Sequence, residues 1–172
     1  MKYKVRPTQH ERVMREDDFI VSKTDLKGRI TYCNRIFVEF AGYTRDELMG
    51  AQHNIVRHPD MPRGVFKFLW DTVEQGQECF AYVKNLCKNG DHYWVFANIT
   101  PDRDAQGNTI GYFSVRRKAS PAAIDQITPL YQAMLAEEAR AGARDACEAS
   151  LALLTRTLQE KGMSYEQFVL GF

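Results

Sequence analysis

Side chains that can bind an anion or move a proton are concentrated in one short stretch, residues 51–62. His53, Arg57 and His58 lie within six residues, and Asp60 follows between two prolines. The prolines restrict the backbone around them, so the stretch is typical of a short, stiff connector and not of a long helix. A guanidinium and two imidazoles between apolar segments indicate the mouth of a site for an anionic or hydrogen-bonding ligand. The alternative is a charged surface loop that ends in proline.

The same stretch carries a motif. Residues 54–62 read Asn-Ile-Val-Arg-His-Pro-Asp-Met-Pro, which resembles the signature of the PAS sensor domain of bacterial aerotaxis receptors. Further motifs follow in the family's order and spacing, at residues 22–34, 42–50, 83–85 and 88–94. The resemblance covers roughly residues 18–130. In that family the domain binds FAD without a covalent bond and reports redox state or oxygen supply, so the resemblance implies both for this chain.

The elements that would position these side chains follow from hydrophobic periodicity and turn residues. Residues 19–33 indicate a β-hairpin that turns at Gly28. Short helices are expected after Asn34 and after Thr44, which opens a capping box, and a longer apolar helix is expected over residues 64–76. Three more strands are expected at residues 78–86, 92–100 and 109–117. This order predicts an α+β, PAS-type fold, with a five-stranded antiparallel sheet and short helices on one face.

Three segments are expected along the chain: an N-terminal cap or tail, partly helical (1–17), the PAS domain (18–119) and a C-terminal helical extension (120–172). Within the extension, Thr128-Pro129 predicts a restart of the helix, because proline is favoured at the first helical position. An apolar stripe at helical spacing follows, formed by Cys147, Leu151, Leu154 and Leu158. The stripe could pack on the PAS domain, on a second copy of the chain or on another protein. We expect it to mediate a homodimer or the docking of a partner.

The composition argues against several classes of function. Basic and acidic residues number 23 and 22, a net charge of +1, which gives no electrostatic basis for nucleic-acid binding. No stretch is long and apolar enough to span a bilayer, and no apolar run follows the basic residues 1–6, so no signal peptide is predicted. The four cysteines lack CxxC spacing and are interpreted as buried thiols in a reducing cytoplasm, not as zinc ligands or disulfides.

A flavin needs a flat apolar slot and hydrogen bonds to the polar edge of its ring system. Phe66 and Trp70 are four residues apart on the expected helix and so share a face, which suits the slot; the alternative is that both are core aromatics. Asn85 lies in an apolar strand, where its amide can both donate to and accept from a ring edge. The alternative for Asn85 is a hydrogen bond to local backbone at the end of the strand.

The pyrophosphate of FAD needs cationic or amide groups. Through the resemblance, Arg57 and His53 are expected on phosphate or ribose oxygens, with His58 as a further donor. Asp60 would orient Arg57 or His58. The alternative is a surface pair of Arg57 with Asp60, which is worth little in water.

Three further residues complete the expected cofactor contacts. Asn34 is expected either as a contact or only as a helix cap, and the family motifs add Asn54 and Tyr93. The chain departs from the family at Cys79, where many flavin-binding relatives carry a tryptophan near the ring system. Another cofactor such as haem, or an empty pocket, therefore stays open. The connector at residues 55–57 lacks the photoreactive cysteine of light-sensing flavin domains.

These observations predict a cytoplasmic signal-transduction sensor module that binds FAD and reports redox state or oxygen to a partner protein. The alternative is a cofactor-free PAS module that acts through protein interaction alone. A flavoenzyme is the weaker third class, because no nucleophile–base pair or metal cluster supports catalysis.

Overall fold

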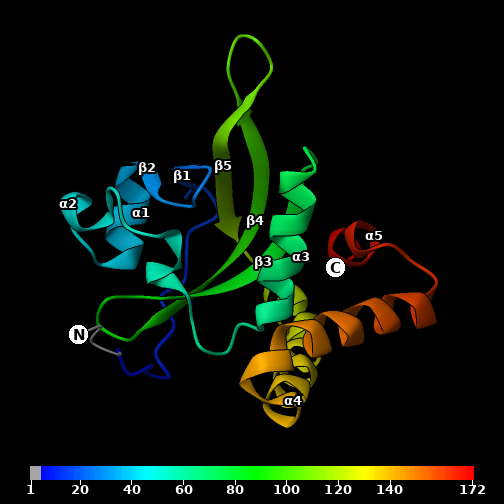
Figure 1. The fold of residues 1–172 in the computed structure, drawn as a ribbon. Helices are drawn as coiled ribbons and strands as arrows, with labels where there is room; N and C mark the ends of the chain where they lie inside the picture. The colour runs from blue at the N-terminus through cyan, green and yellow to red at the C-terminus, as the bar shows by residue number, and fades with distance from the viewer. Residues whose placement is uncertain (1–4) are drawn as a thin grey trace.

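The computed structural model describes residues 5–172 and has a five-stranded sheet at its centre (Figure 1). The spatial order is β2-β1-β5-β4-β3, and every neighbouring pair is antiparallel. The strands are β1 Ile20–Asp25, β2 Ile30–Cys33, β3 Cys79–Leu86, β4 His92–Arg103 and β5 Thr109–Lys118. The predicted five-stranded antiparallel sheet is therefore confirmed.

Short helices cover one face of the sheet, the inner face, as predicted. They are α1 Arg35–Ala41, α2 Arg45–Leu48, the 3₁₀ helix η1 His53–Val56 and α3 Arg63–Glu74. The Asn34 side chain caps α1, and Thr44 with Glu47 forms the predicted capping box of α2. The main core lies between these helices and the inner face, where Phe37 and Leu48 are fully buried.

The β1–β2 hairpin closes through local side-chain and glycine chemistry. Asp25 Oδ1 accepts hydrogen bonds of 2.9 Å from the backbone N–H groups of Lys27 and Arg29. Gly28 has a φ of 76°, a left-handed conformation in which a side chain is strained. A Cβ at Gly28 would lie 3.6 Å from the Trp70 ring of α3. The turn thus packs closely against the helix that faces it.

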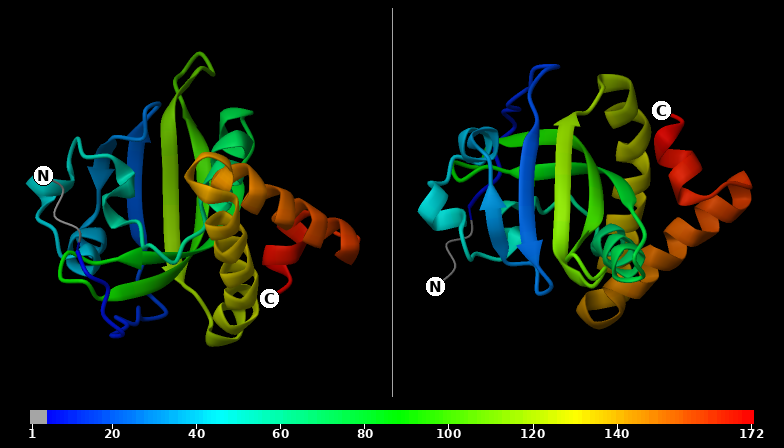
Figure 2. Two further views of the ribbon diagram at one scale, coloured as in Figure 1. Left: turned by 60° about the horizontal axis from the view of Figure 1, so that its bottom comes forward. Right: turned by 90° about the horizontal axis from the view of Figure 1, so that it is seen from above.

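The C-terminal extension, residues 120–172, covers the outer face of β3 and β4 (Figure 2). It consists of α4 Pro121–Lys161 and α5 Tyr165–Leu170. The Tyr131 hydroxyl on α4 donates a hydrogen bond of 2.7 Å to the carbonyl of Tyr82 on β3, and its ring stacks on Trp94 of β4. The extension therefore supplies a second helical layer whose position the sequence left open.

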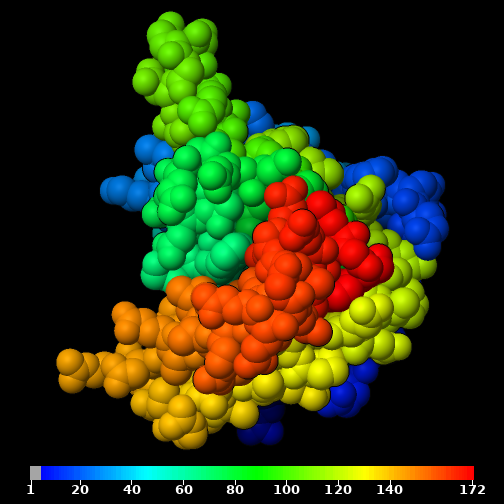
Figure 3. Space-filling model, turned by 90° about the vertical axis from the view of Figure 1, so that its right-hand side faces the viewer, coloured from blue at the N-terminus to red at the C-terminus, as the bar shows by residue number. Residues whose placement is uncertain are grey.

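Helix α4 is bent at Gly142, whose φ of 80° and ψ of 168° are not helical. The helix passes through Pro129, so the predicted restart at that proline is wrong. Ile127 and Tyr131, on either side of Pro129, are buried and hold this half of α4 on the sheet. Their burial offsets the hydrogen bond that the proline nitrogen cannot donate. Beyond the bend, the second half of α4 lies against α3 (Figure 3).

The apolar stripe of α4 is used within the chain. Leu154 and Leu158 are 1% and 8% exposed, and Leu151 packs against the same core. The stripe thus packs on the chain's own core, and the expectation that it offers a free dimer seam is corrected. None of the described helices is both long and apolar enough to cross a membrane.

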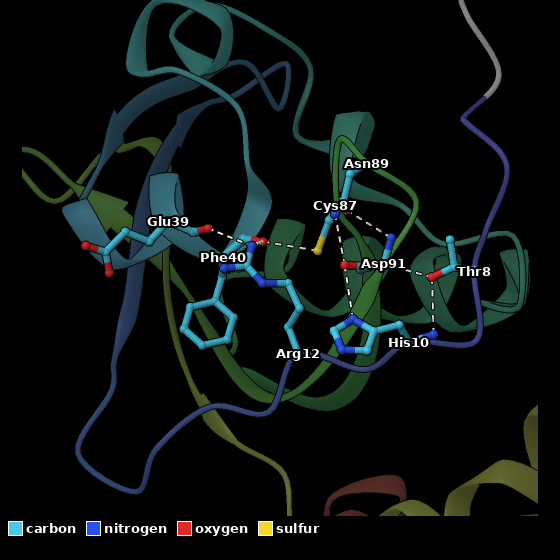
Figure 4. Close-up of polar contacts among 8 residues, drawn as sticks. All are labelled: Thr8, His10, Arg12, Glu39, Phe40, Cys87, Asn89 and Asp91. Carbon is cyan, nitrogen blue, oxygen red and sulfur yellow. Dashed lines mark hydrogen bonds and ion pairs between the residues drawn. The ribbon is translucent and has the colours of Figure 1, made fainter.

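The N-terminal segment, residues 5–17, lies across the β3–β4 turn and α1 without forming a helix, so the expected partial helix is wrong for these residues (Figure 4). Thr8 Oγ1 donates a hydrogen bond of 2.8 Å to Asp91, and Arg12 Nη1 donates to the carbonyls of Glu39 and Phe40. These contacts make the segment a cap over one end of the domain. Residues 1–4 of the predicted cap lie outside the described residues.

Candidate cofactor-binding site

A cavity of about 210 Å³ lies between α3 and the inner face of the sheet. A single buried water needs roughly 10–15 Å³, so this cavity has room for a ligand many times larger than a water molecule. Alternate residues of four strands form its floor: Ser22, Thr24, Val83, Asn85, Ala97, Ile99, Tyr112, Ser114 and Arg116. Side chains from α3 and the connector form its wall and mouth: Gln52, His53, Asn54, Val56, Arg57, Phe66, Leu69 and Trp70.

The wall from α3 is flat and largely apolar. Phe66 and Trp70 both line the cavity, as their spacing of four residues predicted, with Leu69 beside them. The Trp70 ring meets Tyr112 of β5 edge to face, with ring centroids 5.2 Å apart. Two aromatic side chains facing an apolar strand surface form a slot that suits a planar ligand.

Arg57 lies at the mouth of this slot. Its backbone pairs with Asn85 in an antiparallel bridge, and its guanidinium carbon lies 4.2 Å from the centroid of the Phe66 ring. Burial lowers the pKa of Arg57, while the charge of Glu138 acts in the opposite direction. Asp60 forms its ion pair with Lys84, at 2.7 Å, so the alternative of a surface pair between Arg57 and Asp60 is wrong. Its Nη2 donates a long hydrogen bond of 3.5 Å to the carbonyl of Met61.

Arg116 of β5 is the charged group at the centre of the floor. It is 3% exposed, and no carboxylate of residues 5–172 pairs with it. Its Nη1 lies 3.1 Å from His53 Nε2, its Nη2 donates to Ser22 Oγ, and its Nε has no partner among the described residues. Burial lowers the pKa of Arg116 to about 10, which leaves a cation at neutral pH. The guanidinium carbon lies 4.7 Å from the centroid of the Phe37 ring, but a buried charge without a carboxylate partner is costly in a structural core and typical of a ligand site.

His53 is the neutral neighbour of this cation. Its ring lines the cavity and stacks on Phe37 with centroids 5.7 Å apart. Burial, followed by the charge of Arg116, lowers the pKa of His53 to about 3. Because the guanidinium can only donate, His53 Nε2 accepts and its hydrogen lies on Nδ1. The imidazole thus holds Arg116 toward the cavity without neutralising it.

Buried polar atoms without partners lie on the same inner face. The hydroxyl of Thr24 and the Nε of Arg116, both in the cavity lining, have no hydrogen-bond partner among residues 5–172. Asn85 is 4% exposed, and its side chain lines the cavity next to these groups. Buried polar groups are normally satisfied. Their clustering around one cavity fits a ligand with a polar, electron-rich edge.

The structure places four predicted contacts outside the cavity lining. The Asn34 amide accepts from the N–H groups of Val21 and Phe37 and donates to the carbonyl of Phe19, so it is a helix cap and the ligand role is corrected. Tyr93 is completely buried behind the cavity and packs edge to face on Phe40.

His58 and Asp60 also lie away from the lining. His58 is 2% exposed, and its Nδ1 accepts a hydrogen bond of 3.0 Å from the Asp60 backbone N–H. Asp60 therefore orients His58, one of its two predicted roles, and its carboxylate is held by Lys84. These two residues shape the connector that carries Arg57, and direct contacts with a ligand are not supported for either.

Sequence reasoning missed most of the strand floor, above all Arg116. The signal was present, because alternation along residues 109–118 puts Tyr112, Ser114 and Arg116 on one face. Three consecutive cations, Arg116-Arg117-Lys118, are instead typical of a solvent-exposed segment. Cys79, the departure from the family, is buried outside the cavity lining, and burial raises its pKa to about 12.

Comparison with known proteins gives a family for this architecture. The PAS fold family matches residues 30–116, which hold four of the five strands in whole or in part, α1 to α3 and most of the cavity. The chain belongs to the PAS family. This PAS domain is 44% identical to the aerotaxis receptor of Escherichia coli K12 over 127 residues, which are 74% of the chain and 25% of the receptor. It is 29% identical to the nitrogen fixation regulatory protein of Klebsiella pneumoniae over 100 residues, 58% of the chain and 20% of that protein.

These matches make it a PAS sensor domain of the aerotaxis-receptor type. The chain spans a fifth to a quarter of the length of these two relatives. Among solved structures, a light-oxygen-voltage domain studied with a flavin analogue has a TM-score of 0.57 at 22% identity, over 67% of this chain and 86% of that chain. The light-state structure of the Aureochrome1 LOV domain has a TM-score of 0.56 at 23% identity, over 66% of this chain and 90% of that chain. At these identities the likeness shows the fold alone.

Proposed function

We propose that this PAS domain binds FAD in the cavity and reports redox state or oxygen supply to a partner protein. The observation that carries the proposal is Arg116, a buried cation on the cavity floor without a carboxylate partner among the described residues. A ligand with a negative or electron-rich edge would compensate that charge. The relative with 44% identity is an aerotaxis receptor, which supports the sensor role.

The residues that line the cavity would offer a flavin ring both apolar and polar contacts. The ring would lie between the Phe66–Trp70 wall of α3 and the apolar strand floor, where Val83 and Ile99 face it. Its polar edge would meet the amide of Asn85 and the guanidinium of Arg116. A bound flavin would supply electron transfer, and its reduction would alter charge and hydrogen bonding at that edge.

The mouth of the cavity supports FAD over a flavin without phosphates. Arg57 is the cation at the mouth, and Asn54 adds an exposed amide beside it. Arg57 forms no ion pair with the residues of the connector that carries it, since Asp60 is held by Lys84. Its planar guanidinium can bind two phosphate oxygens at once, which a lysine at this position could not do.

The output would be a change in a protein contact, with no chemical turnover. We propose a signalling protein as the partner and a homodimer as the assembly, formed through a surface other than the apolar stripe of α4, because Leu154 and Leu158 of that stripe are buried within the chain. The four cysteines are unpaired and three of them are buried, which supports a reducing compartment such as the cytoplasm.

The experiment that tests the proposal is extraction and titration. Wild-type protein is heated to release bound material, which is identified by chromatography and mass spectrometry, and the apoprotein is titrated with FAD, FMN, riboflavin and haem. We expect FAD at close to one per chain, with weaker binding of riboflavin. Haem binding in preference to FAD would replace the proposed cofactor, and protein that takes up none of these would favour the cofactor-free interaction module.

A further inference from the structure

Helix α3, the wall of the cavity, begins without a cap of its own. Its N-cap residue is Pro62, which offers no side-chain hydrogen bond, and its first turn contains no acidic residue. The first amides of a helix have no partner within the helix and need an acceptor from elsewhere. In α3 the N–H groups that need such an acceptor are those of Arg63 and Gly64.

The acceptors come from the C-terminal extension. Glu138 Oε1 accepts hydrogen bonds from the N–H groups of Arg63, at 2.6 Å, and Gly64, at 3.3 Å. Ser150 Oγ accepts a second bond from the Gly64 N–H, at 3.0 Å, and lies 2.7 Å from Glu138 Oε1. Ser150 is completely buried. We call this group, Glu138 and Ser150 on the first two amides of α3, the clasp.

Two glycines make the clasp possible. Glu138 precedes the bend at Gly142 and Ser150 follows it, so the bend brings both side chains to the same helix end. At Gly64 the approach is too close for any side chain, because a Cβ would lie 2.4 Å from Ser150 Oγ and 2.7 Å from the Leu151 nitrogen. The start of α3 is therefore built to receive the extension, and Figure 3 shows the second half of α4 (orange) lying directly against the segment of α3 (green).

The clasp acts directly on the wall and mouth of the cavity. Two residues beyond Gly64, α3 presents Phe66, and further along Trp70, to the cavity. The Arg57 guanidinium lies over Phe66, and the charge of Glu138 reaches it. We propose that Glu138 is a positioning residue for the cofactor site, and that the clasp couples docking of the C-terminal extension to occupancy of the cavity.

This inference rests on the proposed function, and it predicts the sign of the effect that a bound cofactor has on docking of the extension. If the docked extension orders the wall that binds the cofactor, then the cofactor must favour the docked extension by the same factor, because coupling between two sites is reciprocal. A change at the cavity could thus be read at residues 120–172. The sequence alone showed no role for Glu138 or Ser150.

The test uses the whole chain and four variants. Glu138→Ala removes the clasp acceptor, Ser150→Ala removes only a hydroxyl, and Glu138→Gln keeps an acceptor oxygen without the charge. Glu137→Ala is the matched control. Glu137 precedes Glu138 in the sequence, but its carboxylate pairs with Arg140 and takes no part in the clasp. FAD affinity is measured by fluorescence titration of the apoprotein. Docking is measured by the rate of tryptic cleavage at Arg144, which follows the bend and has a side chain 96% exposed.

We expect Glu138→Ala to weaken FAD binding about five- to tenfold, at the lower end of typical coupling. It should also speed cleavage at the bend, and FAD should slow cleavage of wild type more than of the variant. Glu138→Gln should lie within about threefold of wild type in both measurements, since a hydrogen-bond acceptor is retained. If Glu138→Ala does not fold, as judged by circular dichroism, Ser150→Ala should show the same pattern at smaller size.

Two failures can be told apart. Wild type that takes up no FAD overturns the proposed function and the coupling with it. Wild type that binds FAD, with folded clasp variants that bind it as tightly as Glu137→Ala and are cleaved at the same rate, overturns the clasp alone. Faster cleavage without any change in FAD affinity would also overturn the coupling, because it would show a merely structural contact.

Discussion

Arg116 and His53 face the cavity as a charged donor and a neutral acceptor, with Nη1 3.1 Å from Nε2. The pair is unlike an ion pair, because the neutral His53 does not cancel the positive charge of Arg116, whose guanidinium carbon also lies 4.7 Å from the centroid of the Phe37 ring. The low pKa of His53 follows in part from that charge. The central claim of a cofactor with an electron-rich edge depends on this relationship.

Replacing Arg116 tests directly whether its charge faces the polar edge of the cofactor. Arg116→Gln should weaken flavin binding and lower the midpoint potential of the bound flavin by about 30–60 mV, since a nearby cation favours the reduced, more negative ring. Arg117→Gln is the control, because its side chain lies over Phe96 on the outer face. The potential is read by spectroelectrochemistry. Equal potentials in the two variants would remove Arg116 from the ring edge.

Asn85 provides a second test on the same floor. Asn85→Ala should shift the absorbance bands or the potential of the flavin while changing the free energy of unfolding of the apoprotein by less than about 1.5 kcal/mol. Asn98→Ala is its counterpart on the adjacent strand, where the amide points to the outer face and donates to Glu78 at 3.1 Å. If both variants keep the wild-type spectrum and potential, the ring-edge role of Asn85 is wrong.

Arg57 should distinguish FAD from riboflavin. Arg57→Ala should weaken FAD binding about tenfold or more, as expected when a charge-assisted hydrogen bond worth about 1.5–3 kcal/mol is lost. Riboflavin, which has no phosphate, should lose much less. Arg35→Ala serves as control, because Arg35 pairs with Glu39 on the surface of α1. An equal loss for both ligands would place Arg57 against the ring and not the pyrophosphate.

The loss of folding stability below neutral pH should report the protonation of His53. Its pKa is about 3 in the folded protein and 6.5 in an unfolded chain, so unfolding takes up a proton between these values. The stabilisation is complete above pH 6.5 and falls as the pH falls, by at most ~1.4 kcal/mol per pH unit. Urea denaturation at pH 7 and pH 5 should show a smaller loss in His53→Gln than in wild type. The same loss in both proteins would mean that His53 is already protonated when folded.

The fold could be predicted largely from the sequence because its determinants are local. Gly28 marks the turn, Thr44 and Glu47 mark a helix start, and alternating apolar residues mark the strands. The same is true of Phe66 and Trp70, whose spacing fixes a shared helix face. Local patterns of this kind need no knowledge of what lies across the molecule.

The residues that could not be predicted are those whose roles depend on distant segments. Arg116 is buried because β1 and β4 flank it, and nothing in its own run of basic residues indicates that. Glu138 looks like one more charge on a helix until the bend at Gly142 brings it to α3. Asn34 was ambiguous because only its capping bond from the Phe37 N–H is local, whereas its bonds with Val21 and Phe19 depend on the neighbouring segment of the chain.

The most direct test of the central claim is the absorbance spectrum of the purified wild-type protein, recorded before and after reduction with dithionite. The account predicts flavin bands that bleach on reduction and return in air, with FAD released at close to one per chain. Arg116→Gln, purified in the same way, should carry less flavin. A colourless wild type that also fails to take up added FAD would contradict the account.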